Sequence, residues 1–176
     1  MNYSDIAKVI CIVFLCLVSA RSSMSQAGGE QSFSIDGGIE HPVPIPKRVM
    51  QLLHAQPSVK EFLANPDNDK QSVLDSFEAA AVDLNKHGKT DFVVTNHVLN
   101  GANIGPFWVF LKTGQGYKLV LSVTSLNLTI MKTRTKGFRN ISAGAATAVS
   151  AHVDVYKFTG KKYRFAFSKK ENLILD

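Results

Sequence analysis

Residues 107–123 read FWVFLKTGQGYKLVLSV, and this stretch decides the fold. Two runs of β-branched and aromatic residues, 107–112 and 117–123, flank a four-residue segment that carries two glycines. This pattern is typical of two antiparallel strands joined by a tight turn. The same pattern returns near the C-terminus, where strands expected over 151–158 and 162–167 flank a Thr-Gly-Lys turn. The sequence therefore predicts an antiparallel sheet.

Three more segments are predicted strands. Apolar and polar residues alternate from 126 to 135, before a turn at Lys136-Gly137, and residues 92–95 are rich in β-forming types. Residues 77–84 are also expected to be extended, although their alanines fit a helix equally well. No repeat of fixed period recurs, which argues against a complete propeller or a solenoid.

Two short helices are expected before the strands. Pro46 and Pro57 each suit a first helical turn, and apolar residues follow both at helical spacing, until Asn65-Pro66 ends the second helix. The predicted class is α+β, with two short N-terminal helices (46–65) packed on an antiparallel β-meander sheet (73–168). These elements form a single domain over 46–176. Residues 28–45, rich in Gly, Ser, Gln and Pro, are expected to be a flexible or extended leader.

Residues 1–27 have the pattern of a signal peptide. Lys8 precedes ten apolar residues, too few to span a bilayer, and small residues offer cleavage after Ala20 or Ala27. Both cysteines, Cys11 and Cys16, lie in the apolar run, so the mature chain would have none and cysteine-based catalysis is excluded. We expect a secreted or periplasmic protein with no transmembrane span after cleavage.

The charge is unevenly distributed along the chain. The hydrophobic content of 45% and charged content of 19% are ordinary for a globular protein and exclude collagen-like, wholly disordered and multi-pass membrane classes. The net charge of +6 hides a strong asymmetry, because residues 112–170 contain twelve Lys and Arg against Asp154 as their single acid. The second half of the chain therefore either forms a basic contact surface or packs against the acidic first half.

One face of the predicted strand 126–135 changes from apolar to cationic along its length. Cations of the last hairpin join it if that hairpin lies alongside. The expected partner is an acidic protein or an anionic envelope polymer, whereas nucleic acid is disfavoured because few aromatic residues are free to stack on bases. A solvated sheet face, in which lysines prevent edge pairing, is the alternative. The candidate binding residues are Lys132, Arg134, Lys136, Arg139, Lys161, Lys162 and Arg164.

Residues 83–91, DLNKHGKTD, place potential oxygen ligands at alternate positions between two predicted strands. This loop resembles the calcium-binding motif of FG-GAP/VCBS-type repeats, which are integrin-like blades. The resemblance implies Ca²⁺ ligation by the side chains of Asp83, Asn85 and Asp91 and by the Lys89 carbonyl. His87 departs from the motif, because the family places Asp or Asn there and imidazole suits hard cations poorly.

The alternative for this loop is a purely structural turn, in which Asp83 and Asn85 accept backbone hydrogen bonds and Gly88 takes a positive φ. A single copy of the motif does not close a propeller. The resemblance therefore concerns a local hairpin.

Enzyme signatures are scarce. The chain has no Gly-x-Ser-x-Gly elbow, no His-Glu-x-x-His and no phosphate-binding glycine loop. We therefore expect a non-catalytic binding protein, for example an inhibitor or immunity-type protein that uses the basic face or the Asn/Gly-rich loop 96–106. The first alternative is a calcium-stabilised FG-GAP/VCBS-like module. The second is a small periplasmic hydrolase that uses His97, His152 and Asp154 as acid and base.

Overall fold

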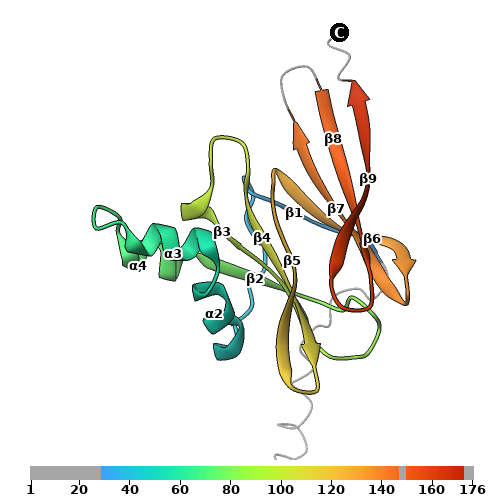
Figure 1. The fold of residues 1–176 in the computed structure, drawn as a ribbon, viewed down its shortest axis with the longest axis horizontal. Helices are drawn as coiled ribbons and strands as arrows, with labels where there is room; N and C mark the ends of the chain where they lie inside the picture. Colours follow the sequence, from blue (N-terminus) through green and yellow to red (C-terminus); the bar gives the residue numbers. More distant parts are fainter. Residues whose placement is uncertain (1–28, 147–149, 173–176) are drawn as a thin grey trace, which may run out of the picture.

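The computed structural model describes residues 29–146 and 150–172. Within these ranges the chain forms three α-helices and nine strands, and the strands pair antiparallel in two sheets (Figure 1). The predicted α+β class and its antiparallel meander are confirmed. The predicted signal peptide, 1–27, lies outside the described residues.

The helices precede the meander. The two expected helices are α2 (Lys47–His54) and α3 (Pro57–Ala64). A third, α4 (Lys70–Asp75), was not predicted, because six residues are too few to show an apolar period. Its local signal is Asp69, whose carboxylate accepts hydrogen bonds from the backbone N–H groups two and three residues later, at 3.0 and 3.3 Å.

The four-stranded sheet has the order β2-β3-β4-β5 and is covered on both faces. Because successive side chains of a strand point to opposite faces, Trp108 and Phe110 pack toward the helices, whereas Phe107 and Val109 pack toward the second sheet. Every residue of β3 is consequently buried. The strands are β2 (Phe77–Val82), β3 (Asp91–Asn96), β4 (Gly105–Thr113) and β5 (Gly116–Ser125), with the 3₁₀-helix η1 (His97–Leu99) between β3 and β4.

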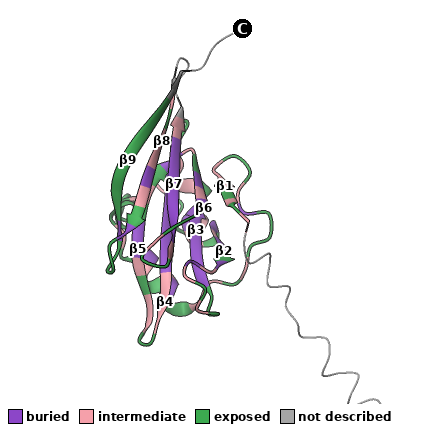
Figure 2. Ribbon diagram, turned by 90° about the vertical axis from the view of Figure 1, so that its right-hand side faces the viewer, coloured by how far each residue is buried: buried purple, intermediate pink, exposed green. Residues whose placement is uncertain are grey.

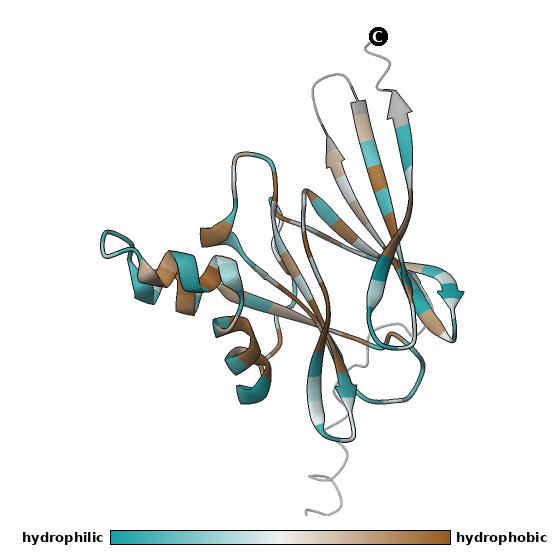
Figure 3. Cartoon of the chain, viewed as in Figure 1, coloured by the Kyte–Doolittle hydropathy of each residue, from teal (hydrophilic) through white to brown (hydrophobic). Residues whose placement is uncertain are grey.

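The five-stranded sheet has the order β1-β6-β7-β8-β9. The helices, the four-stranded sheet and the five-stranded sheet therefore form three layers, with one apolar core at each contact. Apolar residues concentrate where the sheets meet (Figure 3), and burial follows the strands that line this contact (Figure 2). The strands are β1 (Gln31–Ser34), β6 (Asn127–Thr135), β7 (Phe138–Ala146), β8 (Ser150–Phe158) and β9 (Tyr163–Asn172).

Two of these strands correct the sequence-based expectation. The segment 28–45 was expected to be a flexible or extended leader, outside the sheet. Its residues 31–34 form strand β1, which pairs with β6, and Phe33 lies opposite Leu128 and packs against the core. The central strand β7 was not predicted, because its alanine, glycine, serine and asparagine residues carry little β-propensity. The predicted single sheet is divided in two.

The meander places four connecting loops at the same end of the molecule. These are the β2–β3, β4–β5, β6–β7 and β8–β9 loops, at the lower right of Figure 1. They gather because each sheet runs up and down with the same sense and β6 follows β5 after a single residue, Leu126. Residues that are far apart in sequence therefore meet at this end.

Arg139 ties β1 to the rest of its sheet. The pairing of β6 with β7 is interrupted between Ile130 and Arg134, and the Arg139 guanidinium donates to the carbonyls of Ile130 and Met131 there, at 2.7 and 2.8 Å. It also donates to the Gln31 side chain at 3.3 Å and to the Gly29 carbonyl. The side chain is thus a structural bridge, only 4% exposed.

We predict that Arg139→Lys lowers the free energy of unfolding by about 2 kcal/mol or more, because an ammonium group cannot serve four acceptors in different directions. The measurement is urea denaturation followed by circular dichroism. Arg164→Lys, on the exposed side of β9, is the matched control and is expected to change the free energy by less than about 0.5 kcal/mol. Equal effects of the two substitutions would contradict the bridging role.

Candidate functional site

The β2–β3 loop folds around the carboxylate of Asp83. One oxygen, Oδ1, accepts backbone hydrogen bonds from Asn85, Lys86 and His87 at 3.3, 2.7 and 3.3 Å, and Oδ2 accepts one from Gly88 at 3.2 Å. Lys86 and Gly88 take positive φ values of 63° and 72°, which turn the backbone N–H groups inward. The carboxylate therefore serves as the centre of the turn.

These hydrogen bonds determine how Asp83 titrates. Partial burial acts to raise the pKa of its carboxyl, but the donors of the loop backbone and of the His87 ring outweigh burial and hold the pKa below 3.8. The ionised carboxylate is the form that the folded loop favours.

Asp91 joins this loop to β4. Its side chain is fully buried and accepts backbone hydrogen bonds from Leu84 at 3.0 Å and from Lys112 at 2.7 Å. Burial raises the pKa of the Asp91 carboxyl above 3.8, while its two backbone donors and His87 act in the opposite direction.

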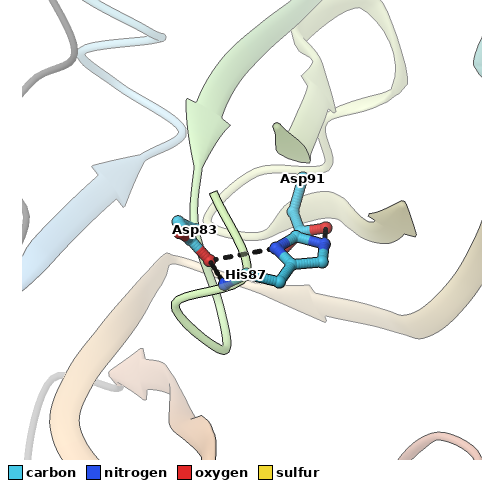
Figure 4. A group of neighbouring side chains, drawn as sticks. All are labelled: Asp83, His87 and Asp91. Atoms are coloured by element: carbon cyan, nitrogen blue, oxygen red, sulfur yellow. Dashed lines mark hydrogen bonds and ion pairs between the residues drawn. The ribbon is translucent and has the colours of Figure 1, made fainter. Parts of the chain in front are cut away.

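His87 lies between the two carboxylates (Figure 4). Its Nδ1 is 3.3 Å from Asp83 Oδ1 and its Nε2 is 3.6 Å from Asp91 Oδ1. In the same loop, Oδ1 of Asn85 is buried and has no hydrogen-bond partner among the described residues. The side chain that departs from the calcium motif thus bridges the two aspartates that match it.

The four predicted calcium ligands have different surroundings. Asp83 and Asp91 come together as expected, and with His87 each offers an atom within 4.8 Å of the others. Both carboxylates, however, already accept backbone N–H groups. For Asp83 this agrees with the structural alternative for this loop, whereas Asn85 Oδ1, which that alternative also makes an acceptor, has no partner in the described part of the chain. The backbone N–H of Lys89 donates a hydrogen bond to Nδ1 of His87, with 3.4 Å between the two nitrogens. Calcium binding stays a prediction.

Leu84 connects this loop to the second sheet. Its carbonyl accepts the backbone N–H of Arg139 at 2.7 Å and the guanidinium of Arg134 at 3.2 Å. The Tyr163 hydroxyl in turn donates to the Arg139 carbonyl at 2.7 Å, and burial raises its pKa well above 10. One hydrogen-bonded path therefore runs from Asp91 to β9.

Exposed cations gather around this path. Arg134 donates to the Gly137 carbonyl at 2.7 Å, and Lys136 Nζ donates to the Thr159 carbonyl at 3.0 Å, so that the β6–β7 and β8–β9 loops adjoin. We call this surface the basic end and define it by six exposed residues, five from three loops and one from the end of β6: Lys86, Lys89, Lys136, Lys161 and Lys162, with Arg134 on β6.

Exposed acidic residues concentrate on another layer. Four of them lie on or beside α3 and α4, which cover the far face of the four-stranded sheet: Glu61, Asp67, Asp69 and Asp75. At the basic end, by contrast, Asp83 and Asp91 are engaged by backbone donors. The helical layer also carries the exposed cations Lys47, Arg48, Lys60 and Lys70, so both signs of charge mix there, whereas the exposed residues that define the basic end are all positive.

The predicted binding residues divide into three groups. Arg134, Lys136, Lys161 and Lys162 meet at the basic end, while Lys132 and Arg164 are exposed on the adjoining strands. Arg139 is buried in its structural bridge and does not contribute to the surface. Sequence reasoning missed Lys86 and Lys89 as members of this surface; their signal was the positive charge between the two aspartates of the predicted calcium loop.

The predicted hydrolase residues do not share one pocket. His97 lines a shallow pocket of about 250 Å³ with Glu78, Thr95 and Asn100, at the end opposite the basic end. His152 and Asp154 do not line it. They lie on β8, where the Asp154 carboxylate accepts a hydrogen bond from the Ser168 hydroxyl.

Comparisons of the chain with protein-family models, with curated proteins and with solved structures find no match. In the described part of the chain, none of the helices combines the length and the apolar character required to cross a bilayer.

The loop around Asp83 gives a prediction on pH dependence. Because its folded pKa lies below the ordinary 3.8, the ionised carboxylate stabilises the fold at pH values above 3.8. This contribution is lost as the pH falls through the folded value. We expect Asp83→Ala to lower the melting temperature at pH 7 and the deficit relative to the parent chain to shrink below pH 3.8.

Asp83→Asn is the matched control, since its amide oxygen can still accept the Lys86 N–H and a smaller deficit is expected. Thermal melts of the three chains between pH 2.5 and pH 7, in a range of buffers about half a pH unit apart, make the comparison. A deficit that grows on acidification would contradict the role given to the carboxylate.

Proposed function

We propose that this chain is an exported, non-catalytic binding protein that contacts an acidic protein partner through its basic end. The observation that carries the proposal is the convergence of six exposed cations, five from three separate loops and Arg134 from the end of β6, which outnumber the two carboxylates of the β2–β3 loop. Export rests on the signal-peptide pattern of residues 1–27.

The surroundings of the basic end support a contact role. The loops that carry the cations are held by backbone hydrogen bonds through Leu84 and Thr159, so part of the ordering cost of binding is met before the partner arrives. Clustered charges of one sign also accelerate association with an oppositely charged partner, and salt weakens this effect. An inhibitor or immunity-type protein acting on an exported toxin or wall hydrolase would use such a surface.

Charge reversal tests this proposal. Polyglutamate serves as the acidic probe, and we expect Lys136→Glu/Lys161→Glu/Lys162→Glu to weaken its binding at least tenfold at low salt. The parent affinity is expected to fall steeply between about 50 and 200 mM salt because exposed charges are screened. Fluorescence anisotropy of labelled polyglutamate measures both effects.

The matched control reverses three exposed lysines on the helical layer, Lys47, Lys60 and Lys70, so that both variants carry the same net charge. At about 150 mM salt, where charges far from the bound probe are screened, the affinity of this control for polyglutamate is expected to lie within about twofold of the parent affinity. Equal losses in the two triple variants would show that net charge, and not the basic end, governs binding.

We also propose, as a second candidate, a calcium-stabilised module similar to FG-GAP/VCBS-type repeats. The supporting observations are that Asp83 and Asp91 lie together and that Oδ1 of Asn85, in the same loop, is buried without a hydrogen-bond partner among the described residues. Binding would require Asp83 to release backbone donors, so a low affinity is expected.

The calcium proposal predicts a higher melting temperature in millimolar Ca²⁺, because a ligand of the native state must stabilise it. Thermal melts with Ca²⁺, with Mg²⁺ and with chelator give the readout, and Asp91→Asn should abolish the difference. A melting temperature that neither Ca²⁺ nor chelator changes would exclude this candidate.

A further inference from the structure

Strand β9 has an open edge. It is the last strand of the five-stranded sheet, and in the described part of the chain no other strand pairs with its outer side. Every residue from 164 to 170 is exposed, and β9 is the long exposed strand at the margin of Figure 2. An edge of this length presents a row of unpaired backbone donors and acceptors to a binding partner.

Two phenylalanines lie on this edge, on opposite faces of the sheet. Phe165 is 58% exposed and pairs with Tyr156, and Phe167 is 39% exposed and pairs with Val155. Residues two apart in a regular strand share a face, but the pairing of β8 with β9 shifts register between Val155 and Tyr156. Val155 and Tyr156 are consecutive and point to opposite faces, so their partners Phe167 and Phe165 do as well. Phe165 accordingly packs edge-on against Tyr156, with the two ring centroids 6.3 Å apart. On the other face, the Lys157 ammonium nitrogen lies 5.4 Å from the centroid of the Phe167 ring.

Cations accompany the phenylalanine on each face. The register places Arg164 and Lys169 on the Phe167 side and Lys170 on the Phe165 side. A flat surface that lies against one face covers one phenylalanine and leaves the other in water. A strand that adds to the edge reaches both faces, because its own side chains alternate between them.

The charge of β9 also argues against pairing with a second copy. Pairing of β9 with a second copy would bring Arg164, Lys169 and Lys170 of one chain close to the same three cations of the other, and like charges repel each other. An acidic strand supplies the complementary charge. It also continues naturally from the basic end, since β9 begins directly after Lys161 and Lys162.

We infer that an extended acidic segment of the partner adds to β9 as a sixth strand of this sheet, with apolar side chains over Phe165 and Phe167 and carboxylates near Arg164, Lys169 and Lys170. The inference rests on the proposed function and names the recognition mode. Backbone hydrogen bonds would provide affinity, and the alternate side chains specificity.

The test uses the full mature chain and a peptide of about ten residues, a typical strand length, with the repeat Val-Val-Glu-Glu, which puts valine and glutamate on both faces. Amide hydrogen exchange by NMR is the readout. We expect the outward-pointing amides between 164 and 170, which alternate on either side of the register shift at Ala166, to exchange at least tenfold more slowly with the peptide bound. The Val-Val-Lys-Lys peptide is the charge-reversed control and should not bind.

Phe165→Ser/Phe167→Ser is expected to weaken the peptide at least tenfold, and thermal melts establish that this exposed double variant is folded. Peptide binding that leaves β9 exchange unchanged would overturn strand addition, as would failure of the peptide to bind while polyglutamate still binds the basic end. In either case the proposed function stands. If the β9 amides of the free protein exchange slowly, and more slowly at higher protein concentration, a second copy is the occupant and the inference is also overturned.

If polyglutamate binding proves independent of the basic end, the proposed function fails. Alternate protection of β9 by the acidic peptide would then still report strand addition as a separate property. Vesicles containing about one third anionic lipid test a membrane surface as the occupant. If they bind the chain and protect both phenylalanines from quenching, but the outward-pointing amides of β9 are not selectively protected, the occupant is a lipid surface and the inference is overturned.

Discussion

The buried carboxylate of Asp91 is the interaction on which the arrangement of the two sheets depends. It holds the Leu84 N–H, and the Leu84 carbonyl then accepts the Arg139 N–H and the Arg134 guanidinium from the other sheet. A charged group removed from water is costly unless its hydrogen bonds are satisfied, so the strands that donate to Asp91 have little freedom to separate. The same contacts bring the cationic loops of the second sheet beside the β2–β3 loop.

The basic end follows from topology. In an up-and-down meander alternate loops share one end, and here the cations of three such loops lie there while acids decorate the helical layer. His87 adds a local feature, since its ring lies between two carboxylates in a loop that resembles a calcium motif. Internal hydrogen bonds thus hold the two carboxylates of this loop in place, and the six cations of the basic end outnumber them.

Much of the fold was predictable because its signals are local. The hairpin around 114–115 appears as two β-forming runs with glycine turns, and helices α2 and α3 appear as apolar residues at helical spacing after a proline. Strands β1 and β7 escaped prediction for the opposite reason. The four residues of β1 are held by pairing with the distant strand β6, and the small side chains of β7 have little β-propensity, so neither strand gives a local signal.

For the candidate site, the amino-acid sequence by itself determined the supply of charge: a cationic second half, an acidic first half and a loop with two aspartates around a histidine. Only the tertiary structure decided which of these charges meet water at one place. Arg139 and Arg134 have the same chemistry and pair with each other across β6 and β7, yet one is a buried bridge and the other an exposed member of the basic end. The physical reason is that burial and hydrogen-bond partners depend on strand register and sheet packing, which bring together residues more than a hundred positions apart, such as Arg139 and Gln31.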